Sequence, residues 1–109
     1  PFTIGLNEVK IGMTLHQVGI ALARDRLVPA AFQRSVNNAE MFDPQGALAA
    51  GFLDKVVPVD QLLVAATAMA QQLKGLNMTA HKQTKLKMRK ALLDALDAGI
   101  EADKLTGLK

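Results

Sequence analysis

The chain has 109 residues, carries a net charge of +3 at pH 7, contains no cysteine and is half hydrophobic. A chain of this length forms one domain at most, and its apolar content excludes an intrinsically disordered protein. Without cysteine, neither a disulfide framework nor a thiolate metal site is available. No apolar run is long enough to span a bilayer, so the sequence predicts no membrane association and a cytoplasmic location.

The first part of the chain predicts one short strand and one helix. The β-prone residues 2–4 form the strand, which Gly5 ends. Leu15, Val18 and Leu22 then recur at spacings of three and four within TLHQVGIALARDRL. This spacing is that of an apolar stripe along one side of a helix.

Proline and glycine punctuate the middle of the chain. A helix over 29–37 begins with a proline, which suits the first turn of a helix. In the segment FDPQGALAAGFLDKVVPVD, Asp43 is a natural N-cap for a helix over 44–50, and Gly51 suits the left-handed residue past its end. Residues 55–57 predict a second short strand, which the next proline stops.

Helices dominate the last half of the chain. Asp60 is the expected cap of a helix that reaches about residue 74, where Gly75 closes it. A long helix over 80–98 follows, and Gly99 interrupts it. The apolar stripes of these two helices are Leu62, Ala66, Met69 and Leu73 in the first, and Met88, Leu92 and Leu96 in the second. The predicted fold is mainly α with short β segments, because two short strands cannot form an independent sheet.

The polar residues exclude several kinds of functional site. His16 and His81 are far apart and belong to no ligand-spaced cluster, so no metal site is predicted. Ser35 is the only serine and lacks the surroundings of a catalytic nucleophile. The basic run over 81–90 is interpreted as a solvated helix face, because nucleic-acid binding would need a broader basic surface and stacking aromatics. One or two of its cations would suit a phosphorylated ligand.

Glu8 stands alone in the segment IGLNEVKIGM, with apolar residues on both sides. An apolar environment disfavours the ionised form of a carboxyl group, which suits a residue that transfers protons. The alternative is a first-turn glutamate stabilised by the helix dipole, with Asn7 as the N-cap. The residues alone favour this second interpretation.

Three segments together resemble the enoyl-CoA hydratase/isomerase (crotonase) family: IGLNEVKIGM, FDPQGALAAGFLDKVVP and AHKQTKLKMRKAL. The resemblance extends from residue 2 to about residue 98, and the helix–strand pattern of the second segment is its most specific part. It implies the C-terminal part of a crotonase-like (ββα spiral) α/β fold with a helical trimerisation region. Residues 1–58 would then end the spiral core, and residues 59–109 would form the helical oligomerisation region.

The resemblance also implies an activity. Glu8 takes the position of a catalytic acid/base, and GLNE is more similar to the enoyl-CoA isomerase branch than to the hydratases, which usually have proline where Asn7 stands. The substrate would be a coenzyme A thioester, without a further cofactor or a metal. Leu15, Val18 and Leu22 would contact the acyl chain if their helix faces it.

The same resemblance implies that other parts of the site lie elsewhere. Many hydratases carry a glycine-rich GGTQRL where this chain has LHQVGIALARDRL. The family's oxyanion hole and most of its coenzyme A contacts would precede Pro1, so the chain reads as a segment of a longer enzyme and is expected to be inactive alone. The active protein would be a homo-oligomer, a trimer or a dimer of trimers.

Two other classes remain as alternatives. A non-catalytic helical interaction or oligomerisation module would need neither Glu8 nor an acyl pocket. A basic module that binds RNA or DNA is the third possibility, and the absence of stacking aromatics argues against it.

Overall fold

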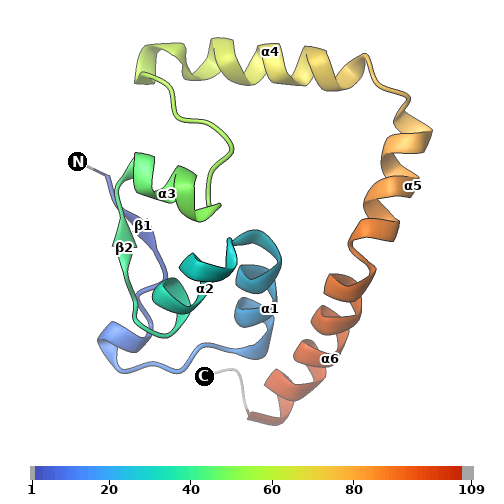
Figure 1. Ribbon diagram of the computed structural model, residues 1–109. Helices are drawn as coiled ribbons and strands as arrows, with labels where there is room; N and C mark the ends of the chain where they lie inside the picture. Colours follow the sequence, from blue (N-terminus) through green and yellow to red (C-terminus); the bar gives the residue numbers. More distant parts are fainter. Residues whose placement is uncertain (1, 107–109) are drawn as a thin grey trace. The chain divides into compact units, whose positions relative to one another are not determined.

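The structure is a computed structural model that describes residues 2–106 (Figure 1). It divides into two compact units, the first built from residues up to 56 together with those from 92 onward, and the second from residues 57–91. The predicted division into a spiral core over 1–58 and an oligomerisation region over 59–109 stays a prediction. Over residues 2–106, no helix is long and apolar enough to cross a membrane.

The first unit combines a two-stranded sheet with several helices. Strand β1 (Ile4–Gly5) pairs antiparallel with β2 (Met41–Phe42), so that Ile4 lies opposite Phe42 and Gly5 opposite Met41. The other elements are the 3-10 helix η1 (Val9–Ile11), α1 (Gln17–Arg26), α2 (Pro29–Val36), α3 (Pro44–Ala50) and the part of α6 (Lys90–Thr106) that follows residue 91. The fold is therefore mainly α with short β segments, as predicted.

Helix α3 forms where the sequence predicts it. Asp43 caps its first turn, because Asp43 Oδ1 accepts a hydrogen bond of 2.7 Å from the Gly46 N–H. At the other end, Gly51 adopts a φ of 104° and donates its N–H to the carbonyl groups of Ala47 and Leu48. The helix predicted over 44–50 is confirmed, and the helix predicted from Pro29 is confirmed to within one residue.

Small side chains fill the core of the first unit. Ala31, Ala47 and Ala50 are almost completely buried around Phe42, whose ring centroid lies 5.8 Å from that of Phe52. Alanine at these positions lets α2 and α3 approach each other and the sheet closely. A chain with so few aromatic residues thus still forms a dense local core.

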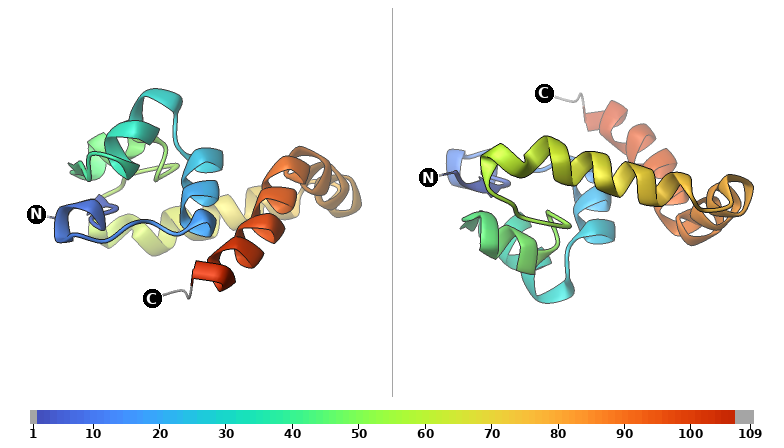
Figure 2. Two further views of the ribbon diagram at one scale, coloured as in Figure 1. Left: turned by 90° about the horizontal axis from the view of Figure 1, so that it is seen from below. Right: turned by 90° about the horizontal axis from the view of Figure 1, so that it is seen from above.

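Helix α6 packs closely against the start of α1 (Figure 2). The predicted helix over 80–98 with an interruption at Gly99 is wrong. Helix α5 (Met78–Met88) ends at Arg89, and α6 continues through Gly99, which is buried. A Cβ atom at Gly99 would lie 3.3 Å from the Val18 backbone nitrogen, so glycine here permits close helix contact and does not break the helix.

Two further predictions in the first unit are wrong. Residues 55–57 form no strand, and the partner of β1 is instead β2, a pair of residues without a clear β pattern in the sequence. The predicted stripe on α1 also fails: Leu15 precedes the helix, Leu22 is 49% exposed, and Ala21 and Ala23 are the buried residues. The spacing predicts buried leucines on this face, whereas the close approach of α6 favours the smaller side chain.

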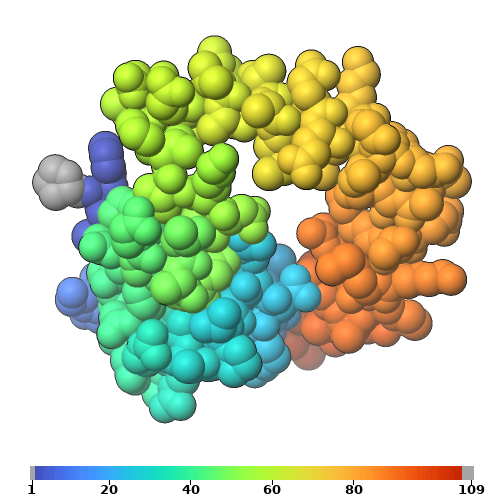
Figure 3. Space-filling view, turned by 45° about the horizontal axis from the view of Figure 1, so that its top comes forward, coloured from blue at the N-terminus to red at the C-terminus, as the bar shows by residue number. Residues whose placement is uncertain are grey.

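The second unit consists of η2 (Val59–Gln61), α4 (Leu62–Lys74) and α5. Helix α4 ends at Lys74 before Gly75, as predicted, but Asp60 lies inside η2 and the N-cap position of α4 is Gln61. None of residues 57–91 is buried. The apolar stripe predicted for α4 is exposed within this chain, with Leu62 62%, Met69 46% and Leu73 41% accessible. Figure 3 draws α4 in yellow-green to yellow.

Alanine substitutions at Gly51 and Gly19 are expected to change the free energy of unfolding in opposite directions. Gly51→Ala forces a side chain onto a φ of 104° and places its Cβ 2.8 Å from the Arg26 carbonyl oxygen, so we expect a loss of about 2–4 kcal/mol. In α1, an added Cβ at Gly19 meets only Leu15 Cδ2, at 3.8 Å. Gly19→Ala should therefore gain about 0.5–1 kcal/mol.

Chemical denaturation of the protein that contains this chain measures both changes. Destabilisation of similar size by the two variants would contradict the different surroundings of the two glycines.

Candidate functional site

The residues before Glu8 are fixed by strand pairing. Gly5 lies so close to β2 that an added Cβ would be 2.6 Å from Met41 Sδ and 2.8 Å from the Glu40 carbonyl oxygen. Only glycine fits this contact without displacing the backbone of one strand. Pairing of β1 with β2 therefore fixes the backbone three residues before Glu8.

The backbone of Glu8 begins the 3-10 helix η1. Its carbonyl oxygen accepts hydrogen bonds from the N–H groups of Ile11 at 3.1 Å and Met13 at 2.8 Å. Glu8 itself occupies the N-cap position, and it makes no side-chain cap hydrogen bond. The interpretation of Glu8 as a first-turn glutamate capped by Asn7 is therefore wrong.

The side-chain carboxylate of Glu8 is unusual in its burial and hydrogen bonding. The side chain is half-buried, and its Oε1 is buried without a hydrogen-bond partner among the residues that the structure describes. A buried polar atom without a partner destabilises the folded state, because it has lost its hydrogen bonds to water. Such an atom calls for a partner that the described residues do not supply.

The apolar residues next to Glu8 in sequence do not enclose it. Val9, Ile11 and Met13 are between 46% and 61% exposed. They form an apolar surface around η1, and the closed pocket expected from these neighbours is absent from the described part of the chain. An acyl chain or another protein segment could cover this surface.

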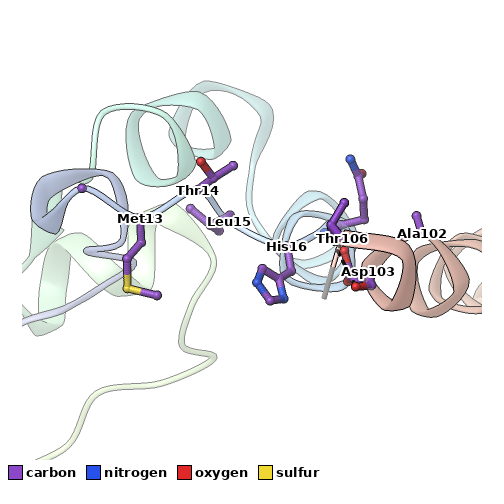
Figure 4. Close-up of a pocket in the computed structure, with 9 residues that line it drawn as sticks. Met13, Thr14, Leu15, His16, Ala102, Asp103 and Thr106 are labelled. Atoms are coloured by element: carbon purple, nitrogen blue, oxygen red, sulfur yellow. Dashed lines mark hydrogen bonds between the residues drawn. The ribbon is translucent and has the colours of Figure 1, made fainter. Parts of the chain in front are cut away.

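Two hollows lie beside the connection between η1 and α1. One, of about 420 Å³, is lined by residues of η1 and by Leu15, Ile20 and Val36. The other, of about 520 Å³, is drawn in Figure 4 and lies between residues 12–17 and the last turns of α6. Leu15, which is buried, lines both hollows.

The structure does not gather the predicted acyl-binding residues into one hollow. Leu15 lines the two hollows just described, Val18 lines a third one with Ile100, and Leu22 is exposed on α1. Their role in substrate binding stays a prediction. The structure adds Asp103, a buried carboxylate at the wall of the hollow in Figure 4, which sequence reasoning missed because no local pattern marks it.

The cations of α5 lie on a separate surface within the second unit. Lys85 and Arg89 line a hollow of about 480 Å³ together with apolar side chains and His81. In residues 2–106, no three His, Cys, Asp or Glu side chains lie close enough to hold a metal ion. The described chain therefore offers carboxylates and cations as its functional groups.

Residues 2–106 match the sequence profile of the enoyl-CoA hydratase/isomerase family, and the chain belongs to that family. It is 35% identical over 108 residues to enoyl-CoA delta isomerase 1, mitochondrial, of Rattus norvegicus, covering 94% of this chain and 35% of that protein. The predicted cytoplasmic location stays a prediction, since this relative is described as mitochondrial.

Solved structures agree with this family membership. An enoyl-CoA hydratase/isomerase family protein from Pseudomonas syringae, whose crystal structure is known, is 70% identical in sequence to this chain and matches it with a TM-score of 0.94. The match covers 96% of this chain and 46% of that one. An enoyl-CoA hydratase from Mycobacterium ulcerans is 38% identical, with a TM-score of 0.90, and the match covers 95% of this chain and 46% of that one. The chain thus spans less than half the length of these relatives, and its fold is consistent with the C-terminal part of theirs.

Gly5→Ala is expected to disturb the site through the backbone. The added Cβ must push β1 away from the Glu40 carbonyl oxygen, so we expect destabilisation by about 1–3 kcal/mol and a displaced Glu8. Thermal unfolding and a crystal structure of the variant protein check both effects. Unchanged stability with an unmoved Glu8 would show that β1 tolerates a side chain at this position.

Proposed function

We propose that the protein containing this chain acts on unsaturated acyl-CoA thioesters and that Glu8 carries the proton, with isomerisation preferred over hydration. The observation that carries the proposal is the buried, unpartnered Oε1 of Glu8. Family membership supports the substrate class, because the family is named for enoyl-CoA conversions.

The carboxylate of Glu8 has the properties that proton transfer from carbon requires. Because Oε1 accepts no hydrogen bond from the described residues, no donor there competes with a substrate proton for its lone pairs. The surrounding apolar surface of Val9, Ile11 and Met13 suits an acyl chain. Desolvation by such a chain strengthens the basicity of a carboxylate relative to water.

The proposed reaction moves one proton and one double bond. The Glu8 carboxylate takes a proton from C2 of a 3-enoyl thioester, and the electron pair shifts into the thioester carbonyl to form an enolate. The Glu8 carboxylic acid then returns the proton at C4 while the double bond forms between C2 and C3. Preorganised N–H donors stabilise such an enolate, and the resemblance implies that these donors precede Pro1.

This division of the site has two consequences. The 109-residue chain alone is expected to show no appreciable turnover, since losing one oxyanion donor typically costs about a hundred- to a thousand-fold in rate. No cofactor is expected, because proton transfer along an acyl thioester needs none beyond the coenzyme A of the substrate.

Isomerisation is preferred over hydration for two reasons. A single carboxylate suffices to carry a proton between two carbons, whereas activation and addition of water use a pair in the hydratases that this chain resembles. The rat relative is also described as an isomerase, although the Mycobacterium ulcerans relative is described as a hydratase.

Glu8→Gln is expected to lower the rate of 3-enoyl-CoA to 2-enoyl-CoA conversion about 10²–10⁴-fold in the protein that contains this chain. Glutamine keeps the size and shape of the side chain, but its amide cannot take up and return a proton. A matched control is Glu101→Gln, since the Glu101 side chain is 74% exposed and pairs only locally with Lys104. Both rates are measured by the absorbance of the conjugated thioester.

Wild-type isomerisation by Glu8→Gln would refute the proposed role of Glu8. Efficient hydration of 2-enoyl-CoA by the unsubstituted protein, without double-bond migration, would make the hydratase reaction the activity instead.

The exposed apolar side chains of α4 and α5 support the further proposal of a homo-oligomer. Leu63 is 79% exposed, Val64 64% and Met88 72%, and no residue of the second unit is buried. Apolar area of this extent is usually covered in the native protein. A neighbouring subunit in a trimer or dimer of trimers would cover it, and the rest of the enzyme core is the other possible cover.

Leu63→Lys is expected to weaken the assembly, because a charge placed in an apolar contact must lose its hydration. Gln72→Lys on the same helix is the control, since it adds the same charge at a polar, exposed position. Light scattering with sedimentation velocity measures the subunit number of both variants. A wild-type protein that is monomeric at high concentration would contradict the proposed oligomer.

A further inference from the structure

We propose that Asp103 is a positioning residue for Glu8, although the two lie almost a hundred residues apart in the sequence. Asp103, on α6, fixes the start of α1, and the segment between η1 and α1 transmits that position to Glu8. The inference rests on the proposed function, because it assumes that Glu8 transfers the proton.

Asp103 caps α1 from a different helix. It is only 3% exposed, its Oδ1 accepts a hydrogen bond of 2.8 Å from the Gln17 N–H, and its Oδ2 accepts one of 3.1 Å from the Val18 N–H. The residue at the N-cap position itself, His16, makes no side-chain cap hydrogen bond. Figure 4 shows the carboxylate at the end of α6 beside the first residues of α1.

Charge and geometry favour this contact. The first N–H groups of a helix have no partner within the helix, and the helix dipole places partial positive charge there. When both oxygens of a buried carboxylate accept hydrogen bonds from these N–H groups, the helix donors and the carboxylate each gain the partners that burial would otherwise remove. Since Asp103 is only 3% exposed and each of its oxygens accepts from a backbone N–H, we assign it to the start of α1 and not to contact with a substrate.

Gly99 makes the contact possible. It lies one turn before Asp103 on the same side of α6, and an added Cβ would be 3.3 Å from the Val18 nitrogen and 3.4 Å from Val18 Cγ2. The absence of a side chain lets the backbone of α6 approach α1 closely enough for the Asp103 carboxylate to reach two consecutive N–H groups. The close approach of α6 at Gly99 and the cap that Asp103 places on α1 therefore belong to the same helix–helix contact.

A short, anchored segment links this contact to Glu8. Residues 12–16 lie between η1 and Gln17; the four from 13 to 16 form the connection, and Leu15 among them is buried. At the far end of the segment, the Met13 N–H donates a hydrogen bond of 2.8 Å to the Glu8 carbonyl oxygen. A shift at the first turn of α1 therefore reaches the Glu8 backbone through residues 13–16. The Asp103 hydrogen bonds hold one end of this segment, the Met13 hydrogen bond holds the other, and buried Leu15 holds the middle.

A displacement of Glu8 would affect the chemical step more than substrate binding. Proton transfer requires the carboxylate oxygen within hydrogen-bond reach of the reacting carbon, and misplacement by about 1 Å can cost roughly a hundredfold in rate. Asp103 is 3% exposed and is assigned no contact with the substrate, so its loss is expected to remove no direct binding contact. The expected signature is a lower kcat at nearly constant KM.

The test compares Asp103→Ala and Asp103→Asn in the protein that contains this chain, with a 3-enoyl-CoA as substrate. The control is Asp43→Ala, which also removes an aspartate helix cap, at α3. We expect the Asp103 variants to lose roughly ten- to a hundredfold in kcat at well below the unfolding temperature, and Asp43→Ala to keep it. Hydrogen exchange at the Gln17 and Val18 amides should accelerate in the Asp103 variants alone.

Asparagine refines the result, because its side chain can accept from one N–H and must turn an NH₂ group toward the other. Asp103→Asn should therefore fall between wild type and Asp103→Ala in both kcat and amide protection. Wild-type kcat in Asp103→Ala, or a kcat loss equal to that of Asp43→Ala, would overturn the inference.

Glu8→Gln, measured in the same series, separates the two proposals. An inactive Glu8→Gln beside a fully active Asp103→Ala overturns the positioning role alone. An active Glu8→Gln overturns the proposed function and, with it, any role of Asp103 in placing Glu8.

Discussion

The buried carboxylate of Asp103 joins the last helix to the first. Its two hydrogen bonds to the Gln17 and Val18 N–H groups connect residues 86 and 85 positions apart. Because Gly99 lets α6 lie against α1, residues from 92 onward belong to the same compact unit as the first 56. The alanine-rich core around Phe42 then packs α2 and α3 against the sheet, while η1 and the connection to α1 follow β1 along the chain.

Two partly or fully buried carboxylates with opposite surroundings define this unit. Asp103 has both oxygens occupied by backbone donors, and it therefore stabilises the fold. Glu8 has a buried oxygen without a partner in the described residues, and the surrounding structure must hold it in place. Strand pairing at Gly5 holds it from one side, and the Met13 hydrogen bond holds it from the other. The hydrogen bonds thus distinguish the group that we propose to react from the group that we propose to position it.

Local signals in the sequence predicted local structure well. The Asp43 cap and the left-handed Gly51 define α3 by interactions within a few residues, so the sequence contained all the required information. The pairing of β1 with β2 and the passage of α6 through Gly99 depend on distant residues, and single-residue propensities do not encode them. Glu8 was singled out by its family resemblance more than by its neighbours, while Asp103 became visible only once α6 was placed against α1.

The proposed function requires that Glu8 removes a proton from C2 of the acyl thioester. The most direct test is the exchange of the C2 hydrogens of a 3-enoyl-CoA with D₂O, followed by NMR in the presence of the wild-type protein and of Glu8→Gln. We predict that wild type catalyses the loss of the C2 proton signal and that Glu8→Gln does so at least about a hundredfold more slowly while remaining folded. Exchange at the same rate with both proteins would contradict the account, because the C2 proton would then be removed by another group.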